Sequence, residues 1–144
     1  SICGLIVGWR VHNGVGDAVA AYALMIAFLF AVIWVGILLG SMLPTPEAVQ
    51  GVGFAAIFPV TFIASTFVPV NTLPGVLKPI AAWNPVTSMA EALRRLFGNP
   101  SGDFGANPPF PLQHPVTYTL IWIAGIVAVC APLAVFFYQR SIRD

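Results

Sequence analysis

The sequence predicts an all-α integral membrane protein with three full transmembrane helices, the end of a fourth, and a re-entrant or interfacial amphipathic helical hairpin. Only 8% of the 144 residues are charged and the mean hydropathy is +0.90, whereas soluble domains carry roughly 25% charged residues. Three stretches, 18–43, 48–70 and 116–138, contain no charged residue, and each is as long as the roughly 20 apolar residues that a helix needs to cross a bilayer. Their apolar residues cover every face instead of alternating, which indicates helices rather than a lipid-facing barrel.

The first nine residues are apolar, but they are too few to cross a membrane. No basic region precedes them, as a signal peptide would require, and Trp9 is suited to the membrane interface. We expect residues 1–9 to be the end of a span whose beginning is missing, so that the sequence is a piece of a longer protein. The polar segment Arg10–Asp17 is expected to form a short loop.

Residues 18–43 are the first full span, and Pro44–Glu47 forms a rigid turn into the second. Gly36 and Gly40 lie four residues apart in the first span, a spacing that permits the close approach of another helix. This pair predicts helix packing, either general packing or, more specifically, a seam between two subunits.

The second span, 48–70, is expected to be loosened or kinked by Gly51, Gly53 and Pro59. Its second half combines aromatic rings with hydroxyl groups, which suits contact with amphiphilic molecules. We predict that these residues line a path through the membrane, with contact to lipid or protein core as the alternative. They are Phe58, Pro59, Thr61, Phe62, Ser65 and Thr66.

Residues 71–115 connect the second span to the third, and they are too apolar for an ordinary loop and too rich in proline for one spanning helix. Asn84 and Pro85 predict the start of a helix, because an asparagine side chain accepts an unpaired backbone N–H and proline at the first position loses no hydrogen bond. Gly98 predicts its end. We therefore expect an amphipathic helix, Pro85–Phe97, in or near the interface.

The predicted helix has one apolar face, formed by Val86, Met89, Leu93 and Leu96. Glu91 and Arg95 lie four residues apart on the other face and can pair. The apolar piece 73–83 is expected to dip into the membrane and return, packed against the spans, because broken backbone at membrane depth must be covered. Residues 98–115 are expected to be an extended loop. The residues that define the hairpin are Pro74, Gly75, Asn84, Pro85, Glu91, Arg94 and Arg95.

We find no motif for bond chemistry in the sequence. Lys78, the only lysine, is not part of the Gly-Lys-Ser/Thr motif of a phosphate-binding loop, so ATP hydrolysis would have to come from another chain. His12 and His114 are isolated, which is too few ligands for a metal site. The predicted spans lack the intramembrane charges that ion-coupled carriers use, and this favours a subunit moved by an external motor. A net charge of +1 excludes a strongly basic nucleic-acid binder.

Four segments carry a more specific pattern: Pro44-x-Pro-Glu-Ala-Val-Gln-Gly51, Phe58-Pro-x-Thr-Phe62, Phe67-Val-Pro-Val-Asn-Thr-Leu-Pro-Gly75 and Trp83-Asn-Pro-Val-Thr-x-Met-x-x-Ala-Leu-Arg94. In these segments the chain resembles the ABC-2 type exporter permeases, and most closely their daunorubicin/doxorubicin-resistance branch. The similarity covers nearly the whole chain, which looks like the C-terminal half of such a permease.

The resemblance implies a six-helix subunit of the plasma (inner) membrane with both termini in the cytoplasm, although the first two helices of the family are absent here. It implies an ABC ATP-binding subunit that holds ATP and Mg, a second permease subunit, and a hydrophobic or amphiphilic antibiotic or lipid-like substrate, while this chain binds no cofactor. The connector would then be extracytoplasmic, and the tail 139–144, with Arg140 and Arg143, would be cytoplasmic. The turn residues Thr45, Pro46 and Glu47 would then either form only a rigid turn with a solvated Glu47 or contact the ATP-binding subunit.

Two alternatives from other classes stay open at this point. An ion-coupled secondary transporter would be supported by charged residues inside further spans beyond this sequence. A non-transporting membrane anchor or assembly subunit would neither stimulate nor require ATP hydrolysis by a partner. A count of basic residues, four on the connector side and two on the tail side, favours the opposite orientation, so the orientation given above follows from the resemblance.

Overall fold

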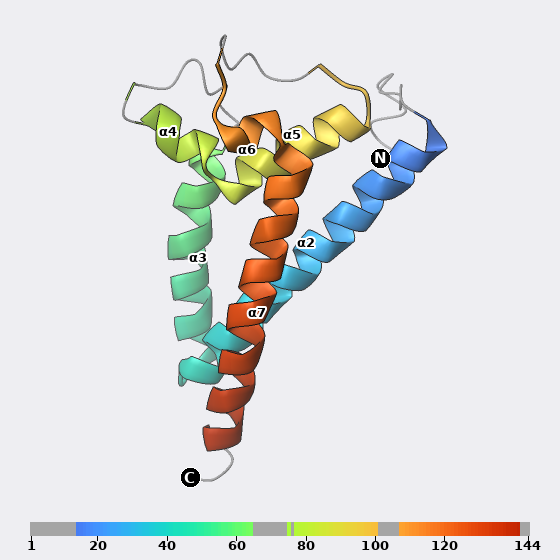
Figure 1. Ribbon diagram of the computed structural model, residues 1–144. Helices are drawn as coiled ribbons and strands as arrows, with labels where there is room; N and C mark the ends of the chain where they lie inside the picture. The colour runs from blue at the N-terminus through green and yellow to red at the C-terminus, as the bar shows by residue number, and fades with distance from the viewer. Residues whose placement is uncertain (1–13, 65–74, 76, 101–106, 142–144) are drawn as a thin grey trace, which may run out of the picture.

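A computed structural model describes residues 14–64, 75, 77–100 and 107–141. The predicted truncated span, 1–9, lies outside these residues. The described part consists of helices joined by turns and loops (Figure 1). In chain order the helices are α2 (Val15–Met42), α3 (Pro46–Ile63), α4 (Leu77–Ala82), α5 (Pro85–Leu96), α6 (Phe110–Gln113) and α7 (Pro115–Ser141).

Three of these helices, α2, α3 and α7, are long and apolar enough to cross a membrane, which confirms the all-α membrane fold that the sequence predicts. α2 begins early enough to place Asp17 in its first turn, where the helix dipole favours a carboxylate. α3 ends at Ile63, because Ala64 has an extended backbone. The rest of the second predicted span, 65–70, lies outside the described residues.

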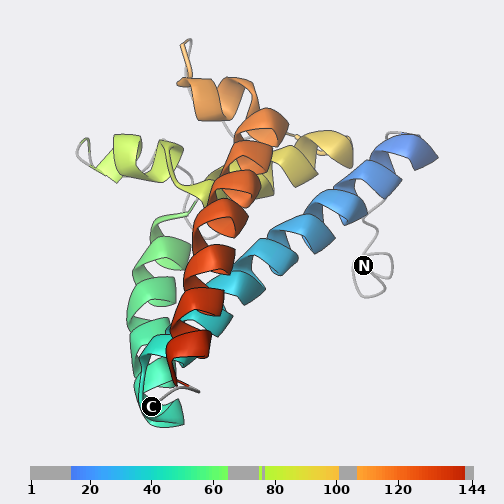
Figure 2. The same cartoon turned by 60° about the horizontal axis from the view of Figure 1, so that its bottom comes forward.

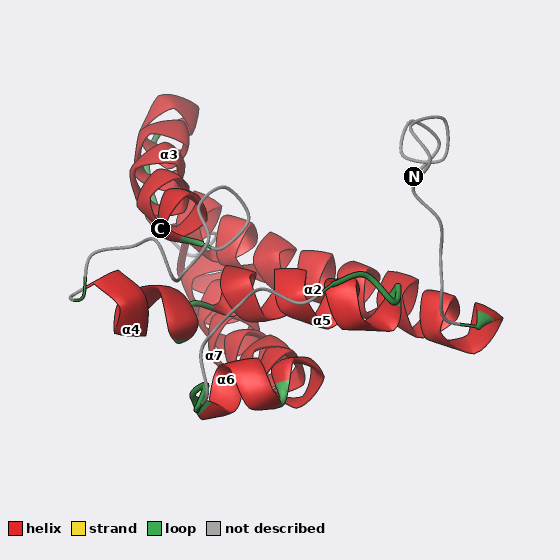
Figure 3. Cartoon of the chain, turned by 90° about the horizontal axis from the view of Figure 1, so that it is seen from above, coloured by secondary structure: helices red, strands yellow, loops and turns green. Residues whose placement is uncertain are grey.

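The connector helices α4, α5 and α6 gather at one end of the spans, and the α2–α3 turn and the end of α7 lie at the other (Figure 1). α2 and α7 therefore run away from the connector, and α3 runs towards it. The view from above shows α4 and α5 lying across the direction of α3 (Figure 3). The turn and the C-terminal end of α7 thus share one side of the molecule.

The packed core lies between α2, α5 and α7. α2 and α7 pack against each other, and α5 packs against both. Leu24 of α2 forms a buried cluster with Met89 and Ala92 of α5, and Leu93 and Leu96 of α5 pack against this cluster. The apolar face of α5 predicted from the sequence is thus a face that docks on the spans.

α3 stands apart from this core (Figures 1 and 2). It contacts α2 and α4, and none of its residues is buried. A helix that is apolar all round needs cover from lipid or from other protein. α3 is therefore the span whose side chains are most available to other molecules.

The segment 98–115 differs from the extended loop that we expected. Phe110–Gln113 forms one helical turn, α6, directly before α7. Pro111 is tolerated because it lies in the first turn, where its missing N–H is not needed, and Leu112 N donates to Pro109 O at 2.9 Å. The expectation is therefore corrected at this turn, where we had treated the prolines as loop signals.

Candidate functional site: the connector and the spans it joins

Helix α5 begins as the sequence predicts. The side-chain oxygen of Asn84 accepts a hydrogen bond from the backbone N–H of Val86 at 2.9 Å, and Pro85 takes the first helical position. Asn84 is only 8% exposed, so its polar atoms need partners within the protein. This residue is therefore held in one orientation at the corner between α4 and α5.

The end of α5 also follows the prediction. Gly98 has a φ of 72°, a left-handed conformation that glycine adopts without steric cost. Gly98 N donates to Arg95 O at 3.1 Å, and Asn99 N donates to Arg94 O at 2.8 Å. This pair of bonds is a Schellman motif, which satisfies the last carbonyls of the helix. Both ends of α5 are thus fixed by local hydrogen bonds.

Glu91 corrects one expectation about α5. Its carboxylate lies 3.5 Å from Arg94 Nη1 and 3.6 Å from Arg95 Nε, so the expected pairing is present. However, Glu91 is completely buried, together with Thr87 and Ser88. Glu91 is enclosed because α2, α4, α6 and α7 all pack around α5, whereas Arg95, on the same face, stays partly exposed.

Arg95 links α5 to the beginning of the last span. Its Nη1 donates to Gln113 O at 2.8 Å, and its Nη2 donates to Leu112 O. Both acceptors lie at the C-terminal end of α6, where a basic side chain is favourable. Since α7 follows α6 directly, Arg95 holds the end of α5 against the start of α7.

The corner between α4 and α5 is bonded to α7 as well. The Tyr118 hydroxyl donates to Trp83 O at 2.9 Å, and the two rings meet edge to face with centroids 6.0 Å apart. The rings of Phe110 and Trp122 lie 6.4 and 6.5 Å from that of Tyr118. We did not single out Tyr118 from the sequence. The available signal was a tyrosine in the first turns of a span, where a ring with a polar end suits the interface.

The side chain of Asn84 also reaches the end of α3. Its Nδ2 donates to Val60 O at 2.7 Å. Val60 is one of the last four residues of α3, whose carbonyls lack a donor within the helix. One amide therefore caps the start of α5 with its oxygen and the end of α3 with its nitrogen. The sequence predicted only the first of these roles.

The residues predicted to line a path lie on α3 as far as the structure describes them. The rings of Phe58 and Phe62, one turn apart, have centroids separated by 4.5 Å. The other described members are Pro59, which is exposed, and Thr61, which is half-buried. Ser65 and Thr66 lie outside the described residues. The two phenylalanines thus form one aromatic surface on the span that stands apart, and its role as a path lining stays a prediction.

The turn between α2 and α3 is explained by helix capping. The Thr45 hydroxyl accepts a bond from Ala48 N at 3.2 Å, Pro46 occupies the first position of α3, and Glu47 lies exposed in its first turn. A groove of about 460 Å³ runs along the turn. Its lining residues are Gly40, Leu43, Pro44, Thr45, Pro46, Val49 and Gln50. Contact of this turn with an ATP-binding subunit stays a prediction.

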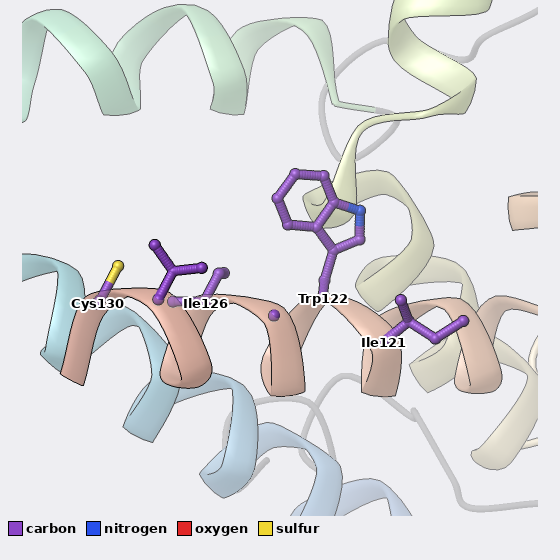
Figure 4. Close-up of a pocket in the computed structure, with 6 residues that line it drawn as sticks. Ile121, Trp122, Ile126 and Cys130 are labelled. Carbon is purple, nitrogen blue, oxygen red and sulfur yellow. The ribbon is translucent and has the colours of Figure 1, made fainter. Parts of the chain in front are cut away.

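A second groove, of about 450 Å³, lies on α7. Trp122, Ile126 and Cys130 point from α7 towards α3 (Figure 4). On α2, apart from the adjoining residues and the helix's own backbone, no described atom lies within 4 Å of the place where a Cβ would stand at Gly36 or Gly40. The described part of the chain makes no close helix contact at this glycine pair, so the seam with a second subunit stays a prediction.

Three apolar spans, with two of them hydrogen-bonded at one end to transverse connector helices, define a multi-pass α-helical membrane protein. A sequence model of the family described as "ABC-2 type transporter" matches residues 1–97. The chain belongs to the ABC-2 type transporter family.

Named relatives agree with this assignment. The chain is 32% identical over 138 residues to the daunorubicin resistance ABC transporter permease protein DrrB1 of Streptomyces coeruleorubidus, covering 96% of this chain and 45% of that protein. It is 26% identical over 146 residues to the probable doxorubicin resistance ABC transporter permease protein DrrC of Mycobacterium tuberculosis (strain CDC 1551 / Oshkosh), covering 96% of this chain and 46% of that protein. The chain thus spans about half the length of these relatives. No solved structure matches it closely enough to count as a relative.

Proposed function

We propose that this chain forms part of the permease subunit of an ATP-driven exporter that moves hydrophobic or amphiphilic compounds out of the cell. The observation that carries the proposal is membership of the ABC-2 type transporter family over residues 1–97. The names of the relatives, which refer to daunorubicin and doxorubicin resistance, support an amphiphilic antibiotic as the substrate class. The exposed aromatic surface of α3, with Phe58 and Phe62, suits such a substrate.

In this proposal the α2–α3 turn and the tail face the cytoplasm, and the connector faces the opposite side. An ABC ATP-binding subunit, which holds ATP and Mg, contacts the turn around Glu47. A second permease subunit, identical or different, packs against the surface of α2 that carries Gly36 and Gly40. The three spans become the fourth, fifth and sixth of a six-helix subunit.

A transporter of this kind has two conformations, and ATP can drive it from one to the other only if ATP binds the two with different affinity. A ligand shifts a conformational equilibrium only by the difference between its affinities for the two states. Movement of the ATP-binding subunit would reach the spans through the α2–α3 turn. The apolar surface of α3 would then be exposed alternately to the two sides of the membrane.

The test is substrate-dependent ATP hydrolysis in vesicles that contain the full-length permease and the neighbouring ATP-binding subunit. We expect daunorubicin to stimulate hydrolysis, and the stimulation to disappear when the permease is omitted. A matched control replaces the phosphate-loop lysine of the ATP-binding subunit, which abolishes hydrolysis but leaves the permease intact. Hydrolysis that does not depend on the permease would contradict the proposal and favour the anchor alternative. Accumulation driven by a proton or sodium gradient without ATP would favour the ion-coupled alternative.

A further inference from the structure

Asn84 stands at the point where three segments of the protein meet. Its amide nitrogen is bonded to Val60 O at 2.7 Å, and its amide oxygen accepts from Val86 N at 2.9 Å. The residue before it, Trp83, accepts the bond from the Tyr118 hydroxyl of α7. The α4–α5 corner therefore touches the end of α3 and the start of α7 through hydrogen bonds.

Within the described residues, α3 packs lightly against the other helices. None of its residues is buried, and among the described helices it packs with α2 and α4. A span without buried side chains is not held in place by core packing, so a directional bond at its end has a large share in its position. The bond to Asn84 is one such directional bond, and because Asn84 is almost completely buried, water does not readily replace its amide.

From this geometry we propose that Asn84 is a positioning residue that couples α3 to the connector. A displacement of the end of α3 is transmitted through the Asn84 amide to α5, and through Arg95 and α6 to the start of α7. If α3 lines the path, as the proposed function holds, the same amide joins the wall of the path to the helices that cover its end. The mechanical coupling rests on the contacts described above, and only its consequence for transport rests on the proposed function.

Substitutions at position 84 separate the two roles of the amide. Asn84→Asp keeps the side-chain oxygen that caps α5, since aspartate and asparagine are similar N-caps, but it removes the N–H donor and places a carboxylate oxygen near Val60 O. Asn84→Ser also keeps a capping oxygen, without the amide donor and without a charge. Asn84→Ala removes both roles.

The experiment measures distances by pulsed EPR in the full-length permease, with its native cysteines replaced. Spin labels at the exposed positions Ile57 of α3 and Leu120 of α7 report the α3–α7 distance. A second pair, at the exposed positions Ile26 of α2 and Leu120 of α7, is the matched control, because α2 and α7 pack against each other in the core. We expect Asn84→Asp and Asn84→Ser to broaden or shift the α3–α7 distribution and to leave the α2–α7 distribution as in the wild type.

The outcomes separate this coupling from the proposed function. Unchanged α3–α7 distances in both variants would overturn the coupling. A change of the α3–α7 distances in Asn84→Asp but not in Asn84→Ser would assign the effect to the added charge. This result would also overturn the coupling. The distances require neither a substrate nor an ATP-binding subunit, so they test the coupling even if the protein is not an exporter. In the exporter assay, we expect both variants to transport severalfold fewer daunorubicin molecules for each ATP hydrolysed.

Discussion

The guanidinium of Arg95 lies against the backbone oxygen of Gln113, 18 positions further along the chain, with Nη1 and O 2.8 Å apart. This contact joins the end of α5 to the end of α6, and therefore to the beginning of the last span. Arg95 thus holds together the helices on either side of the α5–α6 connection. The connector is in this way a structural part of the spans and not a separate loop.

The first prediction concerns the hydrogen bonds from Arg95 to the backbone oxygens of Leu112 and Gln113. Arg95→Ala removes the hydrogen-bond donors of two backbone carbonyls, and we expect it to lower the free energy of unfolding by about 1–2 kcal/mol. Two hydrogen bonds from a fully buried guanidinium would contribute more, but the Arg95 side chain is partly exposed. Arg95→Lys should recover little of this, since an ammonium cannot present the same fork of donors. Thermal unfolding of the full-length permease in detergent measures the effect. Lys78→Ala, which removes an exposed charge from the same connector, is the control, and equal losses in Lys78→Ala and Arg95→Ala would contradict the assigned role.

The second prediction concerns the end of α5. Gly98→Ala forces a Cβ into a left-handed conformation and should cost about 1–2 kcal/mol. Gly98→Asn should cost less, because asparagine adopts this conformation more readily. Gly125→Ala in α7, where no described atom would meet the new Cβ, is the control and should not lower the stability, since alanine fits a helix interior better than glycine. Thermal unfolding again gives the measurement, and a tolerated Gly98→Ala would show that the Schellman motif does not contribute to stability.

The bounds of α5 could be predicted because its signals are local. Asn84, Pro85 and Gly98 act on backbone groups one to four residues away, so their spacing alone indicates where the helix begins and ends. The burial of Glu91 could not be predicted in this way. It depends on helices that are distant in the sequence, and an amphipathic pattern does not state how many faces of a helix have neighbours.

The second role of Asn84 illustrates the same limit. Its bond to Val60 O spans 24 residues, and a backbone carbonyl has no residue type by which a sequence could reveal it. The separate position of α3 was also hidden, because a span exposed to lipid and a span buried among helices are equally apolar. Composition and spacing therefore predicted the spans, whereas their mutual contacts required coordinates.

The third prediction tests the proposed seam on α2. We expect Gly36→Leu and Gly40→Leu to leave the fold of one subunit intact, because a Cβ at either position would meet open space in the described part of the chain. If a second permease subunit packs there, the larger side chains should lower the dimer fraction several-fold, since small residues are what permit close helix approach. Crosslinking between differently tagged full-length subunits measures the dimer. Gly125→Leu is the control, and an unchanged dimer fraction in both α2 variants would place the seam elsewhere.

The fourth prediction concerns the aromatic surface of α3. Phe58 and Phe62 are exposed and their rings lie 4.5 Å apart, so Phe58→Ala and Phe62→Ala should cost little stability while removing contact area for an amphiphilic substrate. An aromatic contact contributes roughly 0.5–1.5 kcal/mol, which corresponds to a rise of about 2- to 12-fold in the KM for daunorubicin transport. The maximal rate should change less, because the aromatic contact stabilises the bound substrate and the transition state of its movement to a similar extent. Phe136→Ala, at an equally exposed ring on α7, is the control. A KM that rises as much in Phe136→Ala as in the α3 variants would mean that the effect is general to apolar surface, and the path would then have to be sought on another span.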